Sequence, residues 1–107
     1  GKSMALEMLL SGKFIDAGEA KRIGLINHVW PDAELVDQTR LLASSIARNP
    51  PLSVALIKQA VNDGTNNDLI TSLDLIASHI AIAKNGPDHI EAINAFKEKR
   101  EGSYVGF

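Results

Sequence analysis

The sequence contains no cysteine, which excludes disulfide bonds and thiolate metal sites. The absence of cysteine also suits a reducing compartment. Aromatic residues make up only 5% of the chain, whereas alanine, leucine and isoleucine are plentiful. Because small and aliphatic side chains interdigitate well between helices, this composition favours a protein built of packed helices.

Long apolar runs and an excess of positive charge are missing as well. No run approaches the roughly 20 residues that a membrane-spanning helix needs, and the first residues do not follow the pattern of a signal peptide. The net charge of −2 argues against a dedicated nucleic-acid-binding protein, because the neutralisation of phosphates requires a basic surface. We therefore expect a cytoplasmic protein with neither a membrane nor a nucleic acid as its partner.

The residues that are present fit one ordinary globular domain. The chain has 107 residues, of which 45% are hydrophobic and 22% are charged. Apolar periodicity and the signals for helix starts and stops predict an all-α fold of about six helices with one short extended link. The predicted helices cover residues 4–10, 17–23, 33–48, 51–63, 68–84 and 87–100, and the link covers residues 26–30.

Local signals set the bounds of the first two helices. Ser3 is predicted to cap the first helix, which Gly12 ends because glycine readily adopts a left-handed backbone conformation. Asp16 is predicted to cap the second helix, and Glu19 completes a variant of the capping box three residues later. Gly24 is the expected end of that helix.

The predicted helix over residues 68–84 is apolar on two sides. Leu75 and Ile82 lie seven residues apart, nearly opposite its main stripe. A helix that is apolar on two sides is buried on two sides. It is therefore either the central helix of its own bundle or a helix that contacts another domain or subunit, and the pattern does not decide between them. The main stripe consists of Leu69, Leu73, Ile76, Ile80 and Ala83.

The last predicted helix ends in a basic cluster, Lys97, Lys99 and Arg100. Cations near a helix C-terminus are favoured by the helix dipole, and this explanation alone could account for them. The alternative is an anion site held by side-chain charge, because the end of a helix offers a phosphate carbonyl groups rather than N–H groups. Ile93 and Phe96 are expected to face inward on this helix.

Other site types find little support in the sequence. Gly1-Lys2-Ser3 matches the end of a phosphate-binding P-loop, but the chain lacks the strand and the earlier glycine of that motif. Residues 19–29 resemble the start of a helix-turn-helix, but Pro31 comes too soon for a recognition helix.

No histidine or carboxylate stands out as a catalytic or metal-binding group. The histidines His28, His79 and His89 lack the spacing of metal ligands, and His79 is expected off the main apolar stripe, as a solvated or capping residue. Glu91 and Glu98 have the positions of ordinary residues on a helix surface. We name no catalytic and no metal-binding residue.

Three stretches together resemble the C-terminal region of the enoyl-CoA hydratase/isomerase (crotonase) family. Residues 1–31 (GKSMALEMLLSGKFIDAGEAKRIGLINHVWP) resemble the family's run G-K-S-x-A-x-E-M-x-L-T-G-x-x-I-x-A-x-E-A-x-x-x-G-L-V-x-x-V. A helix that enters at Asn49-Pro50-Pro51 and contains Lys58 follows. Residues 91–100 (EAINAFKEKR) resemble the family's E-G-x-x-A-F-x-E-K-R. The order and spacing of these stretches agree over essentially the whole chain.

The resemblance implies that residues 1–107 form the helical C-terminal domain of a longer enzyme. The spiral β/α core of the family, with its oxyanion hole and catalytic acids, would lie upstream of Gly1. Helices of this region in the family support trimers, which often pair into hexamers, and they cover the acyl-CoA site. The implied partners are therefore an acyl-CoA substrate and further copies of the same subunit. Coenzyme A enters as part of that substrate, and no covalently bound cofactor is implied.

The resemblance also suggests three residues that contact coenzyme A. The lysine of the family's Glu-Lys-Arg contacts the nucleotide phosphates in some members, and it matches Lys99, which Arg100 follows. Ile80 stands near a position where the family often has an aromatic residue that shapes the adenine or acyl pocket. Ala92 replaces a glycine of the family, and the usual proline-phenylalanine ending is missing, so details of the pocket differ.

The resemblance implies an enzyme that hydrates α,β-unsaturated enoyl-CoA thioesters, with double-bond isomerisation as the alternative in the same family. A third hypothesis is a helical interaction module without a catalytic role. We expect the 107-residue chain to be inactive by itself, because the oxyanion donors are absent from it.

Overall fold

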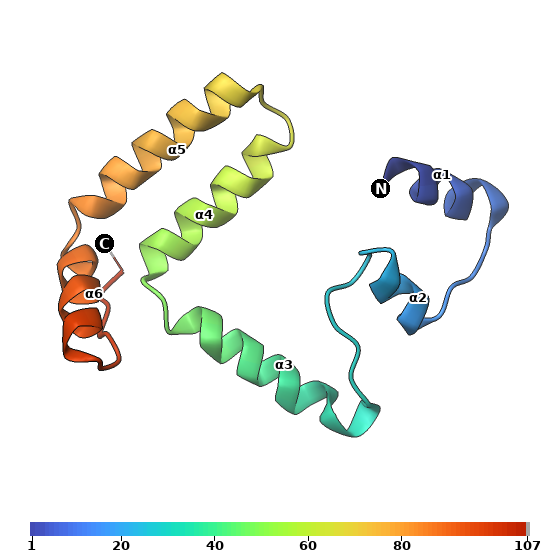
Figure 1. Cartoon of the computed structure of the whole chain (residues 1–107), viewed down its shortest axis with the longest axis horizontal. Coiled ribbons are helices and arrows are strands. Elements are labelled where there is room, and N and C mark those ends of the chain that lie inside the picture. The colour runs from blue at the N-terminus through green and yellow to red at the C-terminus, as the bar shows by residue number, and fades with distance from the viewer. Residues whose placement is uncertain (107) are drawn as a thin grey trace. The chain divides into compact units, whose positions relative to one another are not determined.

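The computed structural model describes residues 1–106 and confirms the all-α prediction (Figure 1). No strand occurs in this described part, and the stretch predicted as an extended link consists of turns and irregular backbone. None of its helices is both long and apolar enough to cross a membrane. The helices are α1 (Lys2–Ser11), α2 (Ala17–Arg22), α3 (Asp32–Ala47), α4 (Pro51–Gly64), α5 (Leu69–Lys84) and α6 (Pro87–Glu98).

The chain divides into two compact units, the first from Gly1 to Arg40 and the second from Leu41 onward. In the first unit, α1 ends at Gly12, whose φ of 65° is left-handed as predicted. The Asp16 carboxylate accepts a hydrogen bond of 2.8 Å from the Glu19 N–H and so caps α2, also as predicted.

The predicted cap at Ser3 is wrong. Helix α1 begins one residue earlier, at Lys2, with Gly1 in the capping position and no side-chain cap. Ser3 therefore lies inside the first turn. Glycine is itself an acceptable N-cap residue, which is why the helix can start before the serine.

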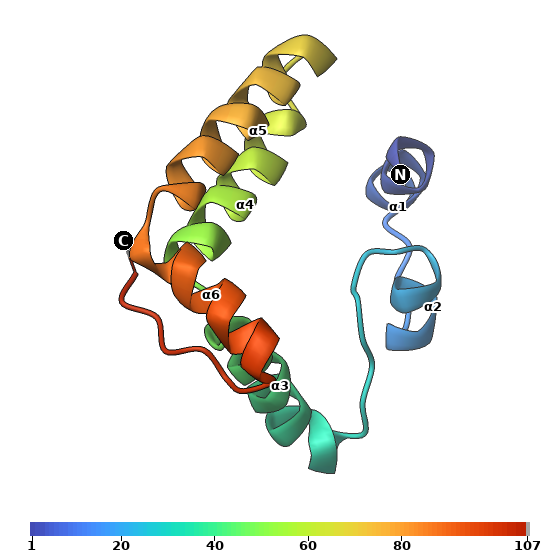
Figure 2. The same cartoon turned by 60° about the vertical axis from the view of Figure 1, so that its left-hand side comes forward.

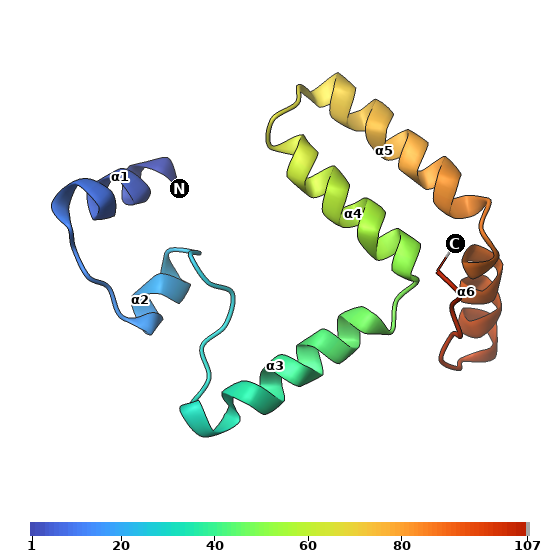
Figure 3. The ribbon, with the colours of Figure 1, turned by 180° about the vertical axis from the view of Figure 1, so that it is seen from behind.

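In the second unit, α4 and α5 lie side by side, and α5 also contacts α6 (Figures 1 and 2). Figure 3 shows the same pair from behind. Pro51 opens α4, where its missing N–H leaves no helical hydrogen bond unmade. The Asp68 carboxylate caps α5 and accepts hydrogen bonds from the Thr71 N–H (3.0 Å) and hydroxyl (2.7 Å).

Few side chains in either unit are buried. The only buried apolar residues among those described are Ala20 and Ala95, whereas large aliphatic side chains are exposed on every helix except α2. On α5 this holds for both predicted apolar sides: Ile80 of the main stripe and Ile82 opposite it are each 52% exposed. Helix α5 is therefore not the central helix of a bundle formed by these residues.

Two expectations about individual side chains are wrong. Phe96 does not face inward but is 85% exposed, and the inward position on α6 belongs to Ala95. His79 is buried rather than solvated. It lies three residues after Ile76 and four before Ala83, on the stripe of α5 that lines a groove with α4.

Candidate functional site

The candidate site lies where α6 ends, at the predicted residues Lys99 and Arg100. The N–H groups of Lys99 and Arg100 bond back to the carbonyls of Phe96 (3.3 Å) and Ala95 (3.0 Å). This pair of hydrogen bonds is a Schellman motif, in which the residue after the helix adopts a left-handed conformation. Lys99 accordingly has φ 55° and ψ 40°. It is the one residue other than glycine with a positive φ in the described chain.

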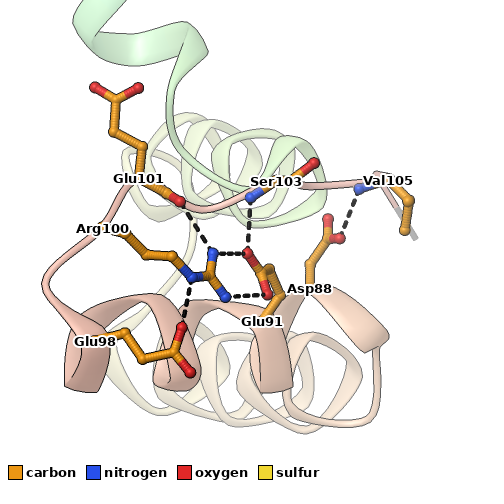
Figure 4. Close-up of polar contacts among 7 residues, drawn as sticks. All are labelled: Asp88, Glu91, Glu98, Arg100, Glu101, Ser103 and Val105. Carbon is orange, nitrogen blue, oxygen red and sulfur yellow. Dashed lines mark hydrogen bonds and ion pairs between the residues drawn. The ribbon is translucent and has the colours of Figure 1, made fainter.

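The Arg100 guanidinium is held by two carboxylates (Figure 4). Its Nη1 and Nη2 donate to the two oxygens of Glu91, with 3.0 Å between Nη2 and Oε2, and its Nε donates to Glu98 at 2.6 Å. Nη1 also donates to the Glu101 carbonyl at 3.0 Å. A guanidinium has five N–H donors, so these contacts leave Arg100 with one donor for any other partner.

The Glu91 carboxylate has a second role, because it also accepts the Ser103 N–H at 2.9 Å. The Arg100 guanidinium, and after it the Ser103 amide, lower the pKa of Glu91 from 4.5 to about 2. The same contact with Glu91 raises the pKa of Arg100. Glu91 is therefore ionised at every physiological pH and cannot act as a proton donor there.

The Asp88 carboxylate binds the next part of the tail. Asp88 is only 5% exposed and accepts hydrogen bonds from the N–H groups of Val105 (2.7 Å) and Gly106 (2.9 Å). Asp88 and Glu91 are one turn apart on α6, and together they hold residues 101–106 along that helix (Figure 4). We call these residues the tail strap.

Lys99 differs from Arg100 in having no ion-pair partner within the described residues. Its side chain is exposed. An ammonium group with free N–H donors can bind a phosphate as a point charge. Phe96, three residues earlier in the sequence, lies in the last turn of α6 with its ring exposed, and an exposed aromatic ring is a surface on which a planar base can stack.

Ile80, the third predicted site residue, is not brought together with Lys99. It lines a groove of about 210 Å³ between α4 and α5, to which the end of α6 contributes no residue. The groove also contains His79, whose Nδ1 is buried and has no hydrogen-bond partner among residues 1–106. Its walls are otherwise mostly apolar and consist of Ser53, Leu56, Ile57, Ala60, Ile76 and Ala83.

The described residues contain no cluster of three or more histidine and carboxylate side chains that could hold a metal ion. The groups described above can recognise a ligand: the exposed ammonium group of Lys99, the exposed ring of Phe96 and the apolar groove. The sequence patterns did not identify the exposed Phe96 or the buried His79 as candidate site residues. The spacing of His79 from Ile76 and Ala83 could have placed it on the stripe, whereas no sequence signal distinguishes an outward Phe96.

A family model described as enoyl-CoA hydratase/isomerase matches residues 1–106. The chain is 34% identical to 1,2-epoxyphenylacetyl-CoA isomerase of Escherichia coli over 99% of its own length and 40% of that protein. It is 36% identical to the short-chain-enoyl-CoA hydratase of Clostridium acetobutylicum, with 94% of the chain and 39% of the relative covered.

Solved structures of the same fold match the chain as well. The crystal structure of an enoyl-CoA hydratase from Bacillus anthracis matches 97% of the chain with a TM-score of 0.94 and 36% identity, over 40% of that protein. The chain thus spans about two fifths of the length of the relatives that it matches. Because the family model matches nearly every residue, the chain belongs to the enoyl-CoA hydratase/isomerase family.

Proposed function

We propose that this chain is the helical C-terminal domain of an enzyme that hydrates α,β-unsaturated enoyl-CoA thioesters. Its role there is to assemble the oligomer, a trimer or a pair of trimers, and to cover the acyl-CoA site. The observation that carries the proposal is the family match over residues 1–106 in a chain that spans two fifths of its relatives.

The exposed apolar surface supports the assembly role. Large aliphatic side chains are uncovered on both sides of α5, among them Ile80 and Ile82. Extensive exposed apolar surface marks contacts with other protein. A catalytic core and neighbouring subunits would provide the missing cover.

In this proposal the chemistry belongs to the core. Backbone amides there would stabilise the enolate of the thioester, and carboxylates would move the protons and activate the water. The 107-residue chain contributes no catalytic residue and has no activity by itself. A cytoplasmic location remains our expectation for the whole enzyme.

Lys99 is the residue that we assign to the coenzyme A phosphates. It is exposed and unpaired among the described residues, and the exposed Phe96 precedes it by three residues in the sequence. Arg100 is less suited to direct contact with the ligand. Its guanidinium is ion-paired with Glu91 and Glu98, and the described contacts leave it one free N–H donor. Ile80 would form part of an apolar wall of the substrate pocket.

Two alternatives remain. An isomerase of the same family is supported by the likeness to 1,2-epoxyphenylacetyl-CoA isomerase. A helical interaction module without catalytic partners would explain the apolar surface but predicts no affinity for coenzyme A.

The test uses the full-length protein that carries this sequence. Light scattering gives its molar mass with and without coenzyme A. Separate assays give its rate of crotonyl-CoA hydration and its rate of double-bond migration in a 3-enoyl-CoA. A trimer or hexamer that hydrates crotonyl-CoA supports the proposal. A faster isomerisation favours the isomerase, and a protein that neither binds coenzyme A nor turns over either thioester favours the interaction module. Turnover by the 107-residue chain alone would contradict the placement of the chemistry in the core.

A further inference from the structure

Lys99 adopts a backbone conformation that a side chain disfavours. A residue with a Cβ pays roughly 1 to 2 kcal/mol to occupy the left-handed region, and glycine is the usual residue at this point of a Schellman motif. The conformation of Lys99 is therefore maintained by its surroundings. Two backbone hydrogen bonds to α6 hold the backbone of Lys99 and Arg100 in place. Other contacts hold the chain after Arg100.

The Arg100 side chain fixes the chain on the far side of Lys99. Its two terminal nitrogens, Nη1 and Nη2, bind the carboxylate of Glu91, nine residues earlier on α6. Nη1 also donates to the carbonyl of Glu101, the next residue. The bidentate contact has directional as well as electrostatic character, since both oxygens of the carboxylate must lie in the plane of the guanidinium. The turn that contains Lys99 is thus closed by the two residues that follow it.

The tail strap extends this anchor. Glu91 accepts the Ser103 N–H with the same oxygen that faces Arg100 Nη1, and Asp88 accepts the N–H groups of Val105 and Gly106. Glu101 adds an ion pair of 3.3 Å to Arg48, which directly follows α3. These contacts lead the chain back along α6 to the helix's own first turn (Figures 2 and 4).

We propose that Glu91 and Arg100 are positioning residues, which hold Lys99 at the end of α6 so that its ammonium group meets a phosphate of coenzyme A. The inference rests on the proposed function of Lys99, and it gives Arg100 a role that acts through Lys99 rather than a direct contact with the ligand. Asp88 supports the same turn through the strap.

Electrostatics and positioning predict opposite signs for one substitution. Glu91→Gln removes a negative charge near the site, so a purely electrostatic effect would tighten the binding of a phosphate. The same change weakens the bidentate contact with Arg100, so the positioning role predicts weaker binding. Glu98→Gln is the matched control: it removes the same charge from the same guanidinium, but Glu98 makes no hydrogen bond to the tail strap.

The experiment measures KM and kcat of the full-length enzyme with crotonyl-CoA and with crotonyl-pantetheine, which lacks the nucleotide phosphates. We expect Lys99→Met to raise the KM for crotonyl-CoA on the order of tenfold, the effect of one charge-assisted hydrogen bond. Glu91→Gln and Arg100→Lys, which keeps the charge but loses the fork, should each raise it about threefold or more. Glu98→Gln should not raise it, and the rise in KM should be absent with crotonyl-pantetheine, which offers Lys99 no phosphate.

The other outcomes distinguish the assignment of Lys99 to a phosphate from the positioning role of Glu91 and Arg100. If Lys99→Met leaves the KM for crotonyl-CoA unchanged, the assignment of Lys99 to a phosphate is wrong. If Lys99→Met raises that KM whereas Glu91→Gln lowers it or leaves it unchanged, the positioning role is wrong and the assignment of Lys99 stands. Equal changes for both substrates would mean that Glu91 and Arg100 support the fold alone. Arg100→Lys, at a side chain that is 42% exposed and with no change of charge, decides the matter if Glu91→Gln fails to fold.

Discussion

The carboxylate of Glu91 binds the guanidinium of Arg100 through both of its oxygens and the backbone amide of Ser103 through one of them. One side chain of α6 thereby fixes both the turn after the helix and the start of the tail strap. This relationship makes the end of α6 a defined structure rather than a frayed terminus, and it leads directly to a pH-dependent prediction.

The strap should loosen in acid. The folded pKa of Glu91 is about 2, below its ordinary value of 4.5. A lowered pKa means that the contact stabilises the folded state fully above about pH 4.5 and that this contribution is lost as the pH falls towards 2. We expect the carboxyl carbon of Glu91 to titrate near pH 2 by NMR, and the protection of the Ser103 amide, measured against its intrinsic exchange rate at each pH, to fall over the same range. Titration of Glu91 near 4.5 would show that the pair with Arg100 does not persist in solution.

The left-handed conformation of Lys99 predicts an order of stability among its variants. Lys99→Gly removes the Cβ and the associated strain, whereas Lys99→Ala keeps both. We expect the glycine variant of the full-length enzyme to exceed the alanine variant by about 1 kcal/mol in its free energy of unfolding, measured with denaturant. A glycine variant that is less stable than the alanine variant would indicate that the turn is not left-handed in solution.

The N-cap of α2 should contribute measurably to stability. Asp16→Ala removes the acceptor of the Glu19 N–H, and we expect a loss of about 1 kcal/mol. Asp16→Asn is the control, because an asparagine caps a helix about as well. The comparison requires chemical denaturation of both variants under the same conditions. Equal losses in the two variants would point to the charge of Asp16 rather than to its hydrogen bond.

The second apolar side of α5 should be an assembly surface. Ile82→Glu places a charge on a side chain that is 52% exposed in this chain. If another subunit or domain covers Ile82 in the whole enzyme, the variant buries an unpaired charge and should dissociate or fail to assemble, which light scattering would detect. Ile82→Leu keeps volume and polarity and should assemble normally. Normal assembly of the glutamate variant would mean that solvent reaches this side of α5.

The fold was largely predictable from the sequence, because local signals carry it. The apolar spacing of residues 68–84, the proline that opens α4, the left-handed Gly12 and the cap at Asp16 all act over a few residues, and all correspond to the structure. Ser3 failed as a cap because α1 already begins at Lys2, and sequence rules do not fix the start of a helix to a single residue.

The site was less predictable, because it depends on contacts between residues far apart in the sequence. Glu91 looked like an ordinary surface residue, yet its partners lie nine and twelve residues away, and those of Asp88 lie seventeen and eighteen away. Periodicity reports which face of a helix a residue occupies and cannot report such pairings. Phe96 was misplaced for a related reason: apolar character predicts burial, whereas the small Ala95 fills the inward position.

The strap has a consequence for how freely its sequence can vary. Ser103 and Val105 contribute backbone amides to Glu91 and Asp88, and both residues are exposed. The carboxylates of Glu91 and Asp88 therefore bind the backbone at these two positions, whatever side chains stand there. Nearly any residue would serve there except proline, which has no amide hydrogen to donate. Substitutions at these two positions would thus leave the path of the tail strap along α6 unchanged.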